Sequence, residues 1–459
     1  MTVTATSAGP ATGTFTARLL AGLPADGRVL DIGGHLRVHG LLPEPRAHRR
    51  GEPSVIAELE AAGLTGRGGG GYPLAAKIRA VRSASGLTRR PVLVVNGAES
   101  EPASRKDSVL LAKAPHLVLD GAQVVADAVR AREIIVWLHR GHGGGPSGSR
   151  TAVERAVAER DDRGMVRQPV RVVVGPARYV AGEASALARH LSGGEARPQT
   201  TPPRVSERGV SGRPTLVSNA ETLAHAALIA RHGADWFHQV GTPEEPGTLL
   251  ITVFGAVRSP GVLEAAAGTT LGALVHAVGA LTAPPAAVLV GGYAGGWLRP
   301  TEAWPVPYSR AGLRSVGLAP GVGLVGVLPA DRCVVVETAR LVGWLAGESA
   351  GQCGPCLNGL PALSAGLRQL AGEVGRAVRA TELPARLARW AGMVDGRGAC
   401  HHPDGVAALV RSLLTHFADD VAAHADGRPC EAARTVPYLG YLPLPAPDSV
   451  ARLDGALWR

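Results

Sequence analysis

Aromatic residues are scarce in this chain, at 4% of all residues, and no apolar run is long enough to cross a membrane as a helix. The most apolar run, Gly317–Ala330, is interrupted by Gly and Pro and is shorter than the roughly 20 residues that a spanning helix needs. We therefore interpret it as a buried strand. The first 20 residues contain no apolar segment behind a basic start, which argues against a secretory signal.

The chain also lacks any basic run interleaved with aromatic residues, although its formal net charge is +10. The positive charge is spread along the sequence and is carried mostly by Arg. This distribution argues against nucleic-acid binding, which usually needs a concentrated basic surface. It fits phosphates, carboxylates or an acidic protein face as partners.

Cysteine is limited to five residues, Cys333, Cys353, Cys356, Cys400 and Cys430. The number is odd and no export signal accompanies it, so a disulfide framework is a poor interpretation. A cytoplasmic chain whose thiols are available for metal fits better.

The hydrophobic share of 45% and the charged share of 19% predict packed globular domains. Between residues 51 and 245, strand-like runs such as Pro91–Gly97 alternate with helix-like segments, which predicts an α/β domain with a parallel sheet. Two strand-like runs followed by a helix predict a small α+β module over 247–330. The stretch 335–427 has a mostly helical pattern, between an N-terminal extension at 1–50 and a Pro-rich tail at 428–459.

A glycine-rich loop, GLTGRGGGGYP, has the spacing of a dinucleotide fingerprint at Gly66, Gly68 and Gly71. A helix-like segment precedes it, whereas the fingerprint requires a strand. Consecutive glycines followed by a helix can still present backbone N–H groups to an anion, with Arg67 and Lys77 adding positive charge. We interpret the loop as a phosphate cradle; the alternative is a flexible loop.

A second polar stretch, NGAESEPASRKD, follows the strand-like run that ends at Gly97. Ligands bind at the carboxyl ends of strands in open α/β sheets. Glu99 and Glu101 could there hydrogen-bond a ring system or a ribose, whereas two glutamates alone more often form a solvated turn.

Together with YVAGEASALARHLSG and GRPTLVSNAETL, these two loops resemble signature segments of one family. That family is the flavin- and NADH-binding subunit of respiratory complex I and of NAD-linked hydrogenases and formate dehydrogenases. The resemblance extends over roughly residues 50–425, with the segments in the family's order. It implies an α/β FMN-binding domain, a ubiquitin-like β-grasp module and a C-terminal helical iron–sulfur domain.

The resemblance also implies the flavin-binding residues. Gly66, Gly68, Gly69, Gly71 and Lys77 match the loop that holds the FMN phosphate in the family, and Arg67 lies in the same loop. The positions expected around the flavin are Asn96, Glu99, Tyr179, Gly182, Glu183, Ser218, Asn219 and Thr222, with Ser218 standing where the family usually has Asn.

The nucleotide side departs from the family pattern, although Tyr72 and Glu101 remain. Five positions carry Ala80, Ala98, Ala184, Thr201 and Arg204 where the family has Phe, Asp, Glu, Lys and Phe. Loss of both stacking faces and of polar anchors would weaken nucleotide binding ~10²–10⁴-fold. The chain would then bind NADH weakly, bind NADPH through Arg67 or Arg204, or use another donor.

The stretch ESAGQCGPCLNG resembles the family's cluster-binding motif, with Ala350 in place of its first Cys. Cys353, Cys356 and Cys400 match the other three ligands. Thiolates favour an iron–sulfur cluster or zinc. We predict a [4Fe-4S] cluster; zinc, or three thiols that only pack in the core, are the alternatives.

The fourth cluster ligand is left open by the sequence. His401 or His402 could supply it, Cys430 could reach it from the tail, or one iron could keep a non-protein ligand. We favour His401. Cys333 lies in the strand-like run DRCVVVET, which we interpret as core packing.

These features predict an FMN- and iron–sulfur-dependent oxidoreductase resembling the NADH dehydrogenase flavin subunit. A hydride from NAD(P)H would enter at FMN, and single electrons would leave through the cluster. We expect electron-transfer subunits or a ferredoxin-like acceptor as partners, in the cytoplasm at the inner face of a membrane complex. Two alternatives remain: a flavin and cluster protein that does not use NADH, and a zinc-stapled interaction module with a vacant flavin site.

Overall fold

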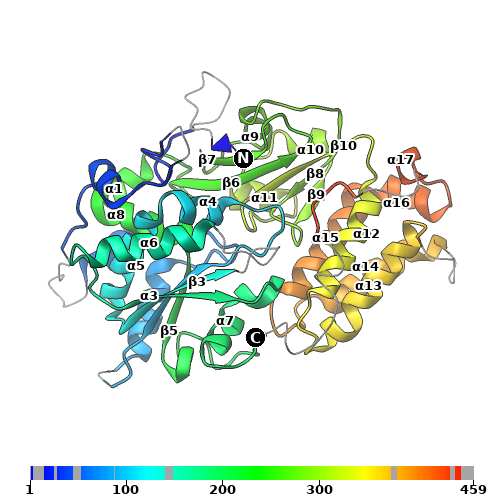
Figure 1. Cartoon of the computed structure of the whole chain (residues 1–459). Helices are drawn as coiled ribbons and strands as arrows, with labels where there is room; N and C mark the ends of the chain where they lie inside the picture. The colour runs from blue at the N-terminus through cyan, green and yellow to red at the C-terminus, as the bar shows by residue number, and fades with distance from the viewer. Residues whose placement is uncertain are drawn as a thin grey trace.

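The computed structural model describes residues 2–3, 15–24, 28–44, 53–86, 88–139, 148–373, 380–434 and 440–445. Most of the predicted tail 428–459 lies outside these ranges, and so do residues 4–14 and 45–50 of the predicted extension. The described residues form a parallel-sheet region, a mixed-sheet region and a helical region, which lie around a common centre (Figure 1).

The first region is built on a four-stranded parallel sheet with the order β4-β3-β2-β5. Its strands are β2 (Val92–Gly97), β3 (Glu133–His139), β4 (Val170–Gly175) and β5 (Thr215–Asn219). Strands β2 and β3 are continuous runs of buried Val, Ile and Leu, as expected when helices cover both faces of a sheet. The predicted α/β class with a parallel sheet is confirmed.

Helices surround this sheet. They are α1 (Ile32–His39), α2 (Ser54–Ala61), α3 (Leu74–Ala84), α4 (Lys106–Lys113), α5 (Pro115–Val129), α6 (Gly148–Asp161), α7 (Ala184–Leu191) and α8 (Ala220–His238). Helix α5 is buried along nearly its whole length against α8. Among the described helices, no single one is both long and apolar enough to span a membrane; α4 and α5 meet that test only as a pair, and they are bent by 95°.

The second region is a six-stranded mixed sheet with the order β1-β7-β6-β10-β8-β9. The strands are β1 (Thr2–Val3), β6 (Thr248–Gly255), β7 (Gly261–Ala266), β8 (Pro285–Val290), β9 (Gly296–Leu298) and β10 (Leu324–Pro329). The hairpin β6–β7 is followed by α9 (Leu271–Ala277), and the later strand β10 returns parallel to β6. This arrangement agrees with the predicted β-grasp module. Two short helices, α10 (Pro300–Ala303) and α11 (Arg310–Ser315), connect β9 to β10.

The third region is helical and forms the right-hand side of Figure 1. It contains α12 (Val334–Gly347), a π-helical turn (Pro355–Gly359), α13 (Leu360–Leu370), α14 (Leu383–Val394), α15 (His402–His416), α16 (Ala418–Ala425) and α17 (Glu431–Arg434). The strand predicted for DRCVVVET is wrong, because Cys333 precedes α12 and the valines lie within that helix. Their intrinsic β preference is overridden by burial of the helix face that contains Val335 and Leu345.

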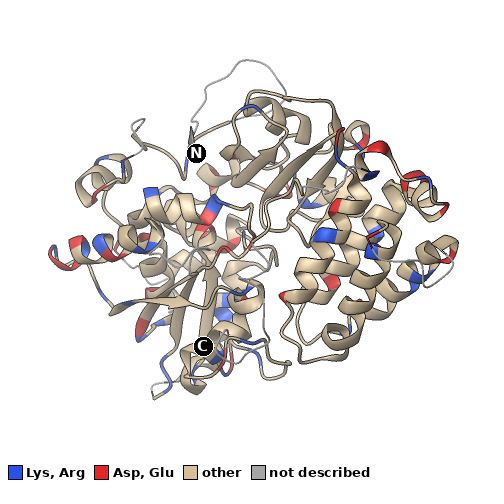
Figure 2. Ribbon diagram, turned by 45° about the vertical axis from the view of Figure 1, so that its right-hand side comes forward, with Lys and Arg blue, Asp and Glu red and all other residues tan. Residues whose placement is uncertain are grey.

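Acidic and basic residues are mixed along the outer helices, while the strands carry few of them (Figure 2). Some of the buried charged residues, among them Glu101, Lys106 and Asp107, line a cavity at the centre. This centre is where the predicted functional residues converge.

Candidate functional site

The carboxyl ends of β2 and β5 lie side by side, because these strands are parallel neighbours with Asn96 opposite Asn219. The loops that leave them form one end of a cavity of about 420 Å³, a size typical of ligand sites. Three helices, α4, α7 and α8, begin beside this cavity, so their positive ends favour an anionic ligand. Eight predicted cofactor-binding residues line it: Gly68, Asn96, Glu99, Glu101, Tyr179, Gly182, Glu183 and Asn219.

The glycine-rich loop lies between α2 and α3 and is tied to the start of α8. The backbone N–H of Arg67 donates to the hydroxyl of Thr222 at 2.8 Å. A Cβ at position 68 would lie 3.2 Å from Cβ of Asn219, and one at position 182 would lie 2.9 Å from Cβ of Ala98. The backbone therefore approaches the cavity where only glycine fits closely. This shape fits the phosphate cradle predicted from the loop.

The two basic side chains predicted to accompany the loop are engaged elsewhere. The guanidinium of Arg67 is buried and donates to Glu245 at 3.3 Å and to the carbonyl of Pro246 at 3.2 Å. Lys77 donates to the carbonyl of Val217 at 2.9 Å, and burial lowers the pKa of its ammonium. The guanidinium of Arg67 is thus directed to Glu245, and its role at a phosphate stays a prediction. Gly66, Arg67 and Gly69 line a smaller neighbouring cavity of about 160 Å³.

Several cavity carboxylates also organise the loops around it. Glu99 accepts from the hydroxyl of Ser104 at 2.7 Å and from the backbone N–H groups of Asp107 and Ser108 at 3.1 and 2.9 Å, which caps α4. Glu183 accepts from two N–H groups in the first turn of α7. These side chains therefore hold helix starts in place as well as facing the cavity.

The amides of Asn96 and Asn219 fix two of the same loops. Asn219 caps α8 and donates to Asp107 at 2.8 Å. Asn96 donates to the carbonyl of Gly182 at 2.8 Å, which joins the loop after β2 to the loop after β4. Ser218, immediately before this cap, is buried in β5. Both amides are thus held in place by hydrogen bonds within the protein.

Glu101 lies at the junction with the β-grasp region and is only 4% exposed. Its carboxylate accepts from the Tyr179 hydroxyl at 2.7 Å and from the backbone N–H of Tyr293 at 3.1 and 3.2 Å. Burial outweighs these hydrogen bonds and raises the pKa of Glu101 to about 7. A carboxyl group with that pKa can hold or release a proton near neutrality.

A buried ion cluster at the floor of the cavity was not predicted from the sequence. Lys106 donates to Asp107 at 3.0 Å and to Glu221 at 2.8 Å, and all three side chains are buried. Burial alone would lower the pKa of Lys106, but the two carboxylates hold it above its usual value. The stretch NGAESEPASRKD contains this Lys–Asp pair, so the signal was present beside the glutamates.

The predicted cluster thiols lie on the helical side of the same cavity. Cys356 is buried in the π-helical turn, while Cys353 and Cys400 are partly buried. Burial and the neighbouring Cys353 thiol, with a further contribution from Cys400, raise the pKa of Cys356 to about 12. Burial also raises the pKa of Cys400 to about 11. Cys353 and Cys400 are thus near enough to influence the Cys356 thiol, and Cys400 also lines the central cavity.

The two histidines after Cys400 differ in environment. The His401 side chain is fully exposed, and its Nδ1 is 2.9 Å from Asp404. His402 is buried, donates from Nε2 to the carbonyl of Leu345 at 2.9 Å, and leaves Nδ1 without a partner among the described residues. Cys430, the other proposed fourth ligand, lies instead beside Cys333 and His424. Of these candidates, His402 has the buried, unpartnered nitrogen, whereas the favoured His401 faces solvent.

Ala350 replaces the first cysteine of the motif and is 5% exposed. It packs against Val180 and Tyr179, in the loop that follows β4. The same loop is bonded to the end of α12: the backbone N–H of Tyr179 donates to Glu348 at 2.8 Å, and Arg178 donates to the carbonyl of Gly347 at 2.7 Å. One short loop therefore contacts both the central cavity and the thiol-bearing turn.

The family models match both functional regions. The Nuo51 FMN-binding domain matches residues 59–227, and the NADH-ubiquinone oxidoreductase-F iron–sulfur binding region matches residues 337–424. The chain is 30% identical over 408 residues to the NADH-quinone oxidoreductase F subunit of Mycobacterium tuberculosis, covering 86% of this chain and 90% of that protein. The chain belongs to the family of NADH-quinone oxidoreductase F subunits. The Streptomyces coelicolor member is also 30% identical, over 82% of this chain and 84% of its own length.

Solved structures of an NAD⁺-reducing [NiFe]-hydrogenase are similar as well. The H₂-reduced form has a TM-score of 0.71 at 29% identity, covering 81% of this chain and 62% of that chain. The air-oxidised form has a TM-score of 0.73 at 28% identity, covering 86% and 65%. This chain therefore spans less than two thirds of those longer chains. Membership in the oxidoreductase family confirms the predicted FMN-binding and iron–sulfur domains; the individual ligand residues stay predictions.

Proposed function

We propose that this protein takes reducing equivalents from a nicotinamide nucleotide at FMN and delivers them one at a time to an iron–sulfur cluster. The observation that carries the proposal is that predicted flavin-binding residues and a predicted cluster cysteine line the same cavity. Gly68, Asn96 and Asn219 line the cavity at the sheet edge, and Cys400 lines it on the helical side. A flavin and a cluster held by these residues would be neighbours without any movement of the domains.

The residues present fit FMN. The close backbone approach at Gly68 and the start of α8 would receive the phosphate, while Asn96, Glu99 and Tyr179 would position the ring system. Bound FMN supplies the chemistry, because it accepts electrons in pairs and releases them singly. The protein supplies orientation and, through Glu101 and Tyr179, a proton-holding group at the cavity wall.

The residues present also fit a cluster held by three thiolates from Cys353, Cys356 and Cys400. The backbone N–H of His402 lies at the start of α15 and hydrogen-bonds the Cys400 sulfur, which offsets part of the effect of burial on that thiol. We propose His402 rather than His401 as the protein group available for a fourth position, because its buried Nδ1 has no partner in the described chain.

Weak nucleotide binding is part of the proposal. Ala98 and Thr201 line the cavity where the family pattern has charged side chains, and Arg204 is exposed. The buried Arg67 is paired with Glu245 and is therefore unsuited to an NADPH phosphate. We propose NADH as a low-affinity donor. Because the relatives are named as subunits, we also propose partner subunits as the electron acceptor.

An anaerobic absorption experiment on the full chain tests the function. The purified protein should show flavin bands and iron–sulfur absorption, and NADH should bleach both. The Cys356→Ser variant should bleach at the flavin while losing most iron and labile sulfide. A colourless parent protein after reconstitution with FMN, iron and sulfide would contradict the proposal. Bleaching by dithionite but never by NADH would instead favour a flavin and cluster protein with another donor.

A further inference from the structure

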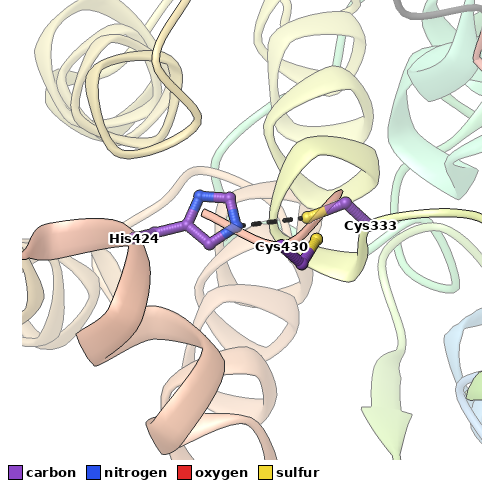
Figure 3. A group of neighbouring side chains, drawn as sticks. All are labelled: Cys333, His424 and Cys430. Atoms are coloured by element: carbon purple, nitrogen blue, oxygen red, sulfur yellow. Dashed lines mark hydrogen bonds between the residues drawn. The ribbon is translucent and has the colours of Figure 1, made fainter. Parts of the chain in front are cut away.

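A second group of soft ligands lies in the helical region and is independent of the predicted cluster. It consists of Cys333, His424 and Cys430, which we call the C-terminal triad (Figure 3). Their ligand atoms, two Sγ and one imidazole nitrogen, all lie within 4.8 Å of one another. Cys333 precedes α12, His424 is in the last turn of α16, and Cys430 immediately precedes α17. Three separate segments therefore converge on one point.

The imidazole is oriented as a metal-binding histidine requires. Its Nδ1 is 3.2 Å from the backbone carbonyl of Leu370, which can only accept a hydrogen bond. In the neutral ring the proton is therefore on Nδ1, and the lone pair is on Nε2. That Nε2 faces Cys333 Sγ at 3.4 Å (Figure 3). A backbone carbonyl that holds the remote ring nitrogen is the usual outer partner of a histidine bound to metal.

The two thiols lie close enough to bind one ion, since their Sγ atoms are within 4.8 Å of each other. Zinc binds thiolates, so metal binding would release the thiol protons.

The distances fit a single ion rather than a cluster. Bonds of about 2.3 Å to sulfur and about 2.0 Å to nitrogen place tetrahedral ligands roughly 3.5–3.8 Å apart. The triad meets this spacing with small side-chain movements, and thiolate–imidazole sets of this kind favour zinc. Cys430 is exposed, so solvent can supply the fourth ligand, whereas Cys333 and His424 are buried.

We propose that Cys333, His424 and Cys430 bind one zinc ion, completed by a solvent ligand, which fastens the segment around α17 to α12 and α16. The site is distinct from the cluster thiols and does not depend on flavin or nucleotide binding. Cys333, interpreted as core packing from the sequence, is buried as expected and in addition faces this site.

Metal analysis of the full, flavin- and cluster-containing chain tests the proposal. The protein is purified anaerobically with reductant, incubated with zinc sulfate, desalted, and measured for zinc, iron, sulfide and FMN. We expect about one zinc per chain in addition to the iron. Cys430→Ser should weaken zinc binding by ~100-fold or more in a chelator competition, beyond the 10–100-fold typical of losing an outer partner. It should leave iron and FMN unchanged.

Three further variants separate the site from its surroundings. Glu431→Ala, at the next exposed position, should keep full zinc, and Cys430→His should keep zinc because imidazole replaces thiolate. Cys353→Ser should lose iron but keep zinc. Zinc that is absent from the parent, unchanged in Cys430→Ser, or lost in Cys353→Ser would overturn the proposal. An intact mass lacking two hydrogens, with Cys333 and Cys430 alkylated only after reduction, would identify a disulfide and overturn it as well.

Discussion

Two groups of residues around the central cavity differ in how their side chains are used. On the flavin side, Glu99 and Asn219 hold helix starts while also facing the cavity. At the positions that depart from the family's nucleotide-binding pattern, Ala98 and Thr201 face the cavity without holding a helix start, although Ala98 lies in the same loop as Glu99. Replacing a residue that both holds a helix start and contacts the ligand lowers the stability of the fold as well as ligand affinity. Replacing a residue that contacts only the ligand lowers ligand affinity and leaves the fold intact. We infer that this difference explains why the flavin side matches the family pattern and the nucleotide side departs from it.

The largest expected effect is a loss of FMN affinity when a larger side chain is placed at Gly68, on the flavin side of the cavity. The Gly68→Val side chain would press on Asn219, since a Cβ at position 68 is already 3.2 Å from Cβ of Asn219. We expect FMN affinity to fall about 100-fold, near the upper range of overpacking costs of ~3 kcal/mol. Fluorescence titration of the flavin-free protein with FMN measures it.

Gly70→Val is the matched control, because a Cβ at position 70 meets nothing within 4 Å. It should bind FMN nearly as well as the parent. Equal losses in the two variants would mean that loop flexibility, and not the approach at position 68, governs binding.

The next prediction concerns Glu101, whose pKa is raised by burial to about 7. Between about pH 4.5 and 7 the folded chain binds more protons at this group than the unfolded chain, so stability falls as pH rises through that window. A shift of this size corresponds to a loss on the order of 3 kcal/mol by pH 8 relative to pH 4.5. In Glu101→Gln this component of the pH dependence should vanish.

Urea unfolding monitored by far-UV circular dichroism at pH 4.5 and 8 provides the measurement. Glu60→Gln serves as the control, because Glu60 is exposed and paired only with Arg79 at the surface. If Glu101→Gln and Glu60→Gln show the same difference between the two pH values, Glu101 does not titrate in this window.

A moderate gain in NADH affinity is expected when a residue of the family's nucleotide-binding pattern is restored. Ala98→Asp places a carboxylate at a cavity position where the family pattern has one, and a hydrogen bond to a charged group contributes ~1.5–3 kcal/mol. We expect the NADH concentration for half-maximal flavin reduction to fall at least ~10-fold. Ala98→Leu adds bulk without a polar group and should give no gain. Stopped-flow bleaching of the flavin under anaerobic conditions measures this concentration for both variants. If the NADH concentration for half-maximal reduction is unchanged in Ala98→Asp, position 98 does not limit nucleotide binding.

The smallest effect is expected at Thr201, which is exposed at the cavity edge. Thr201→Lys adds one solvent-screened charge, so we expect only a ~2–5-fold gain in NADH affinity, corresponding to less than ~1 kcal/mol. The gain should shrink at high ionic strength, because exposed charges are screened. In 1 M salt the Debye length is only about 3 Å, so exposed charges further apart hardly interact. A gain in NADH affinity that persists there would indicate a direct hydrogen bond from the new lysine.

Much of the architecture followed from local patterns. The strand β2 is a strongly patterned apolar run, and the structure has it where the sequence predicted a strand, at Pro91–Gly97. The DRCVVVET run failed as a strand because its valines are buried on a helix face, a tertiary contact that no short window contains. The intrinsic secondary-structure propensity of a segment determines its conformation only where tertiary packing does not favour another one.

The site was predictable where its residues share a loop and unpredictable where they do not. Asn96, Glu99 and Glu101 follow one strand, so the carboxyl-end rule located them together. Glu245 neutralises Arg67 across 178 residues, and His424 meets Cys333 across 91. Such pairs depend on how the regions pack, and a single sequence carries no local signal of that.

The bond between Tyr179 and Glu348 has a consequence for recombining this family's domains. The loop after β4 and the end of α12 are separated by 169 residues in sequence, yet Arg178 and Tyr179 both bond to Glu348. A chimera that exchanges the helical region alone would cut through this contact and strand a buried Arg178 without its carboxylate. Crossover points should therefore be chosen so that residues 176–182 and 334–348 are inherited from the same parent.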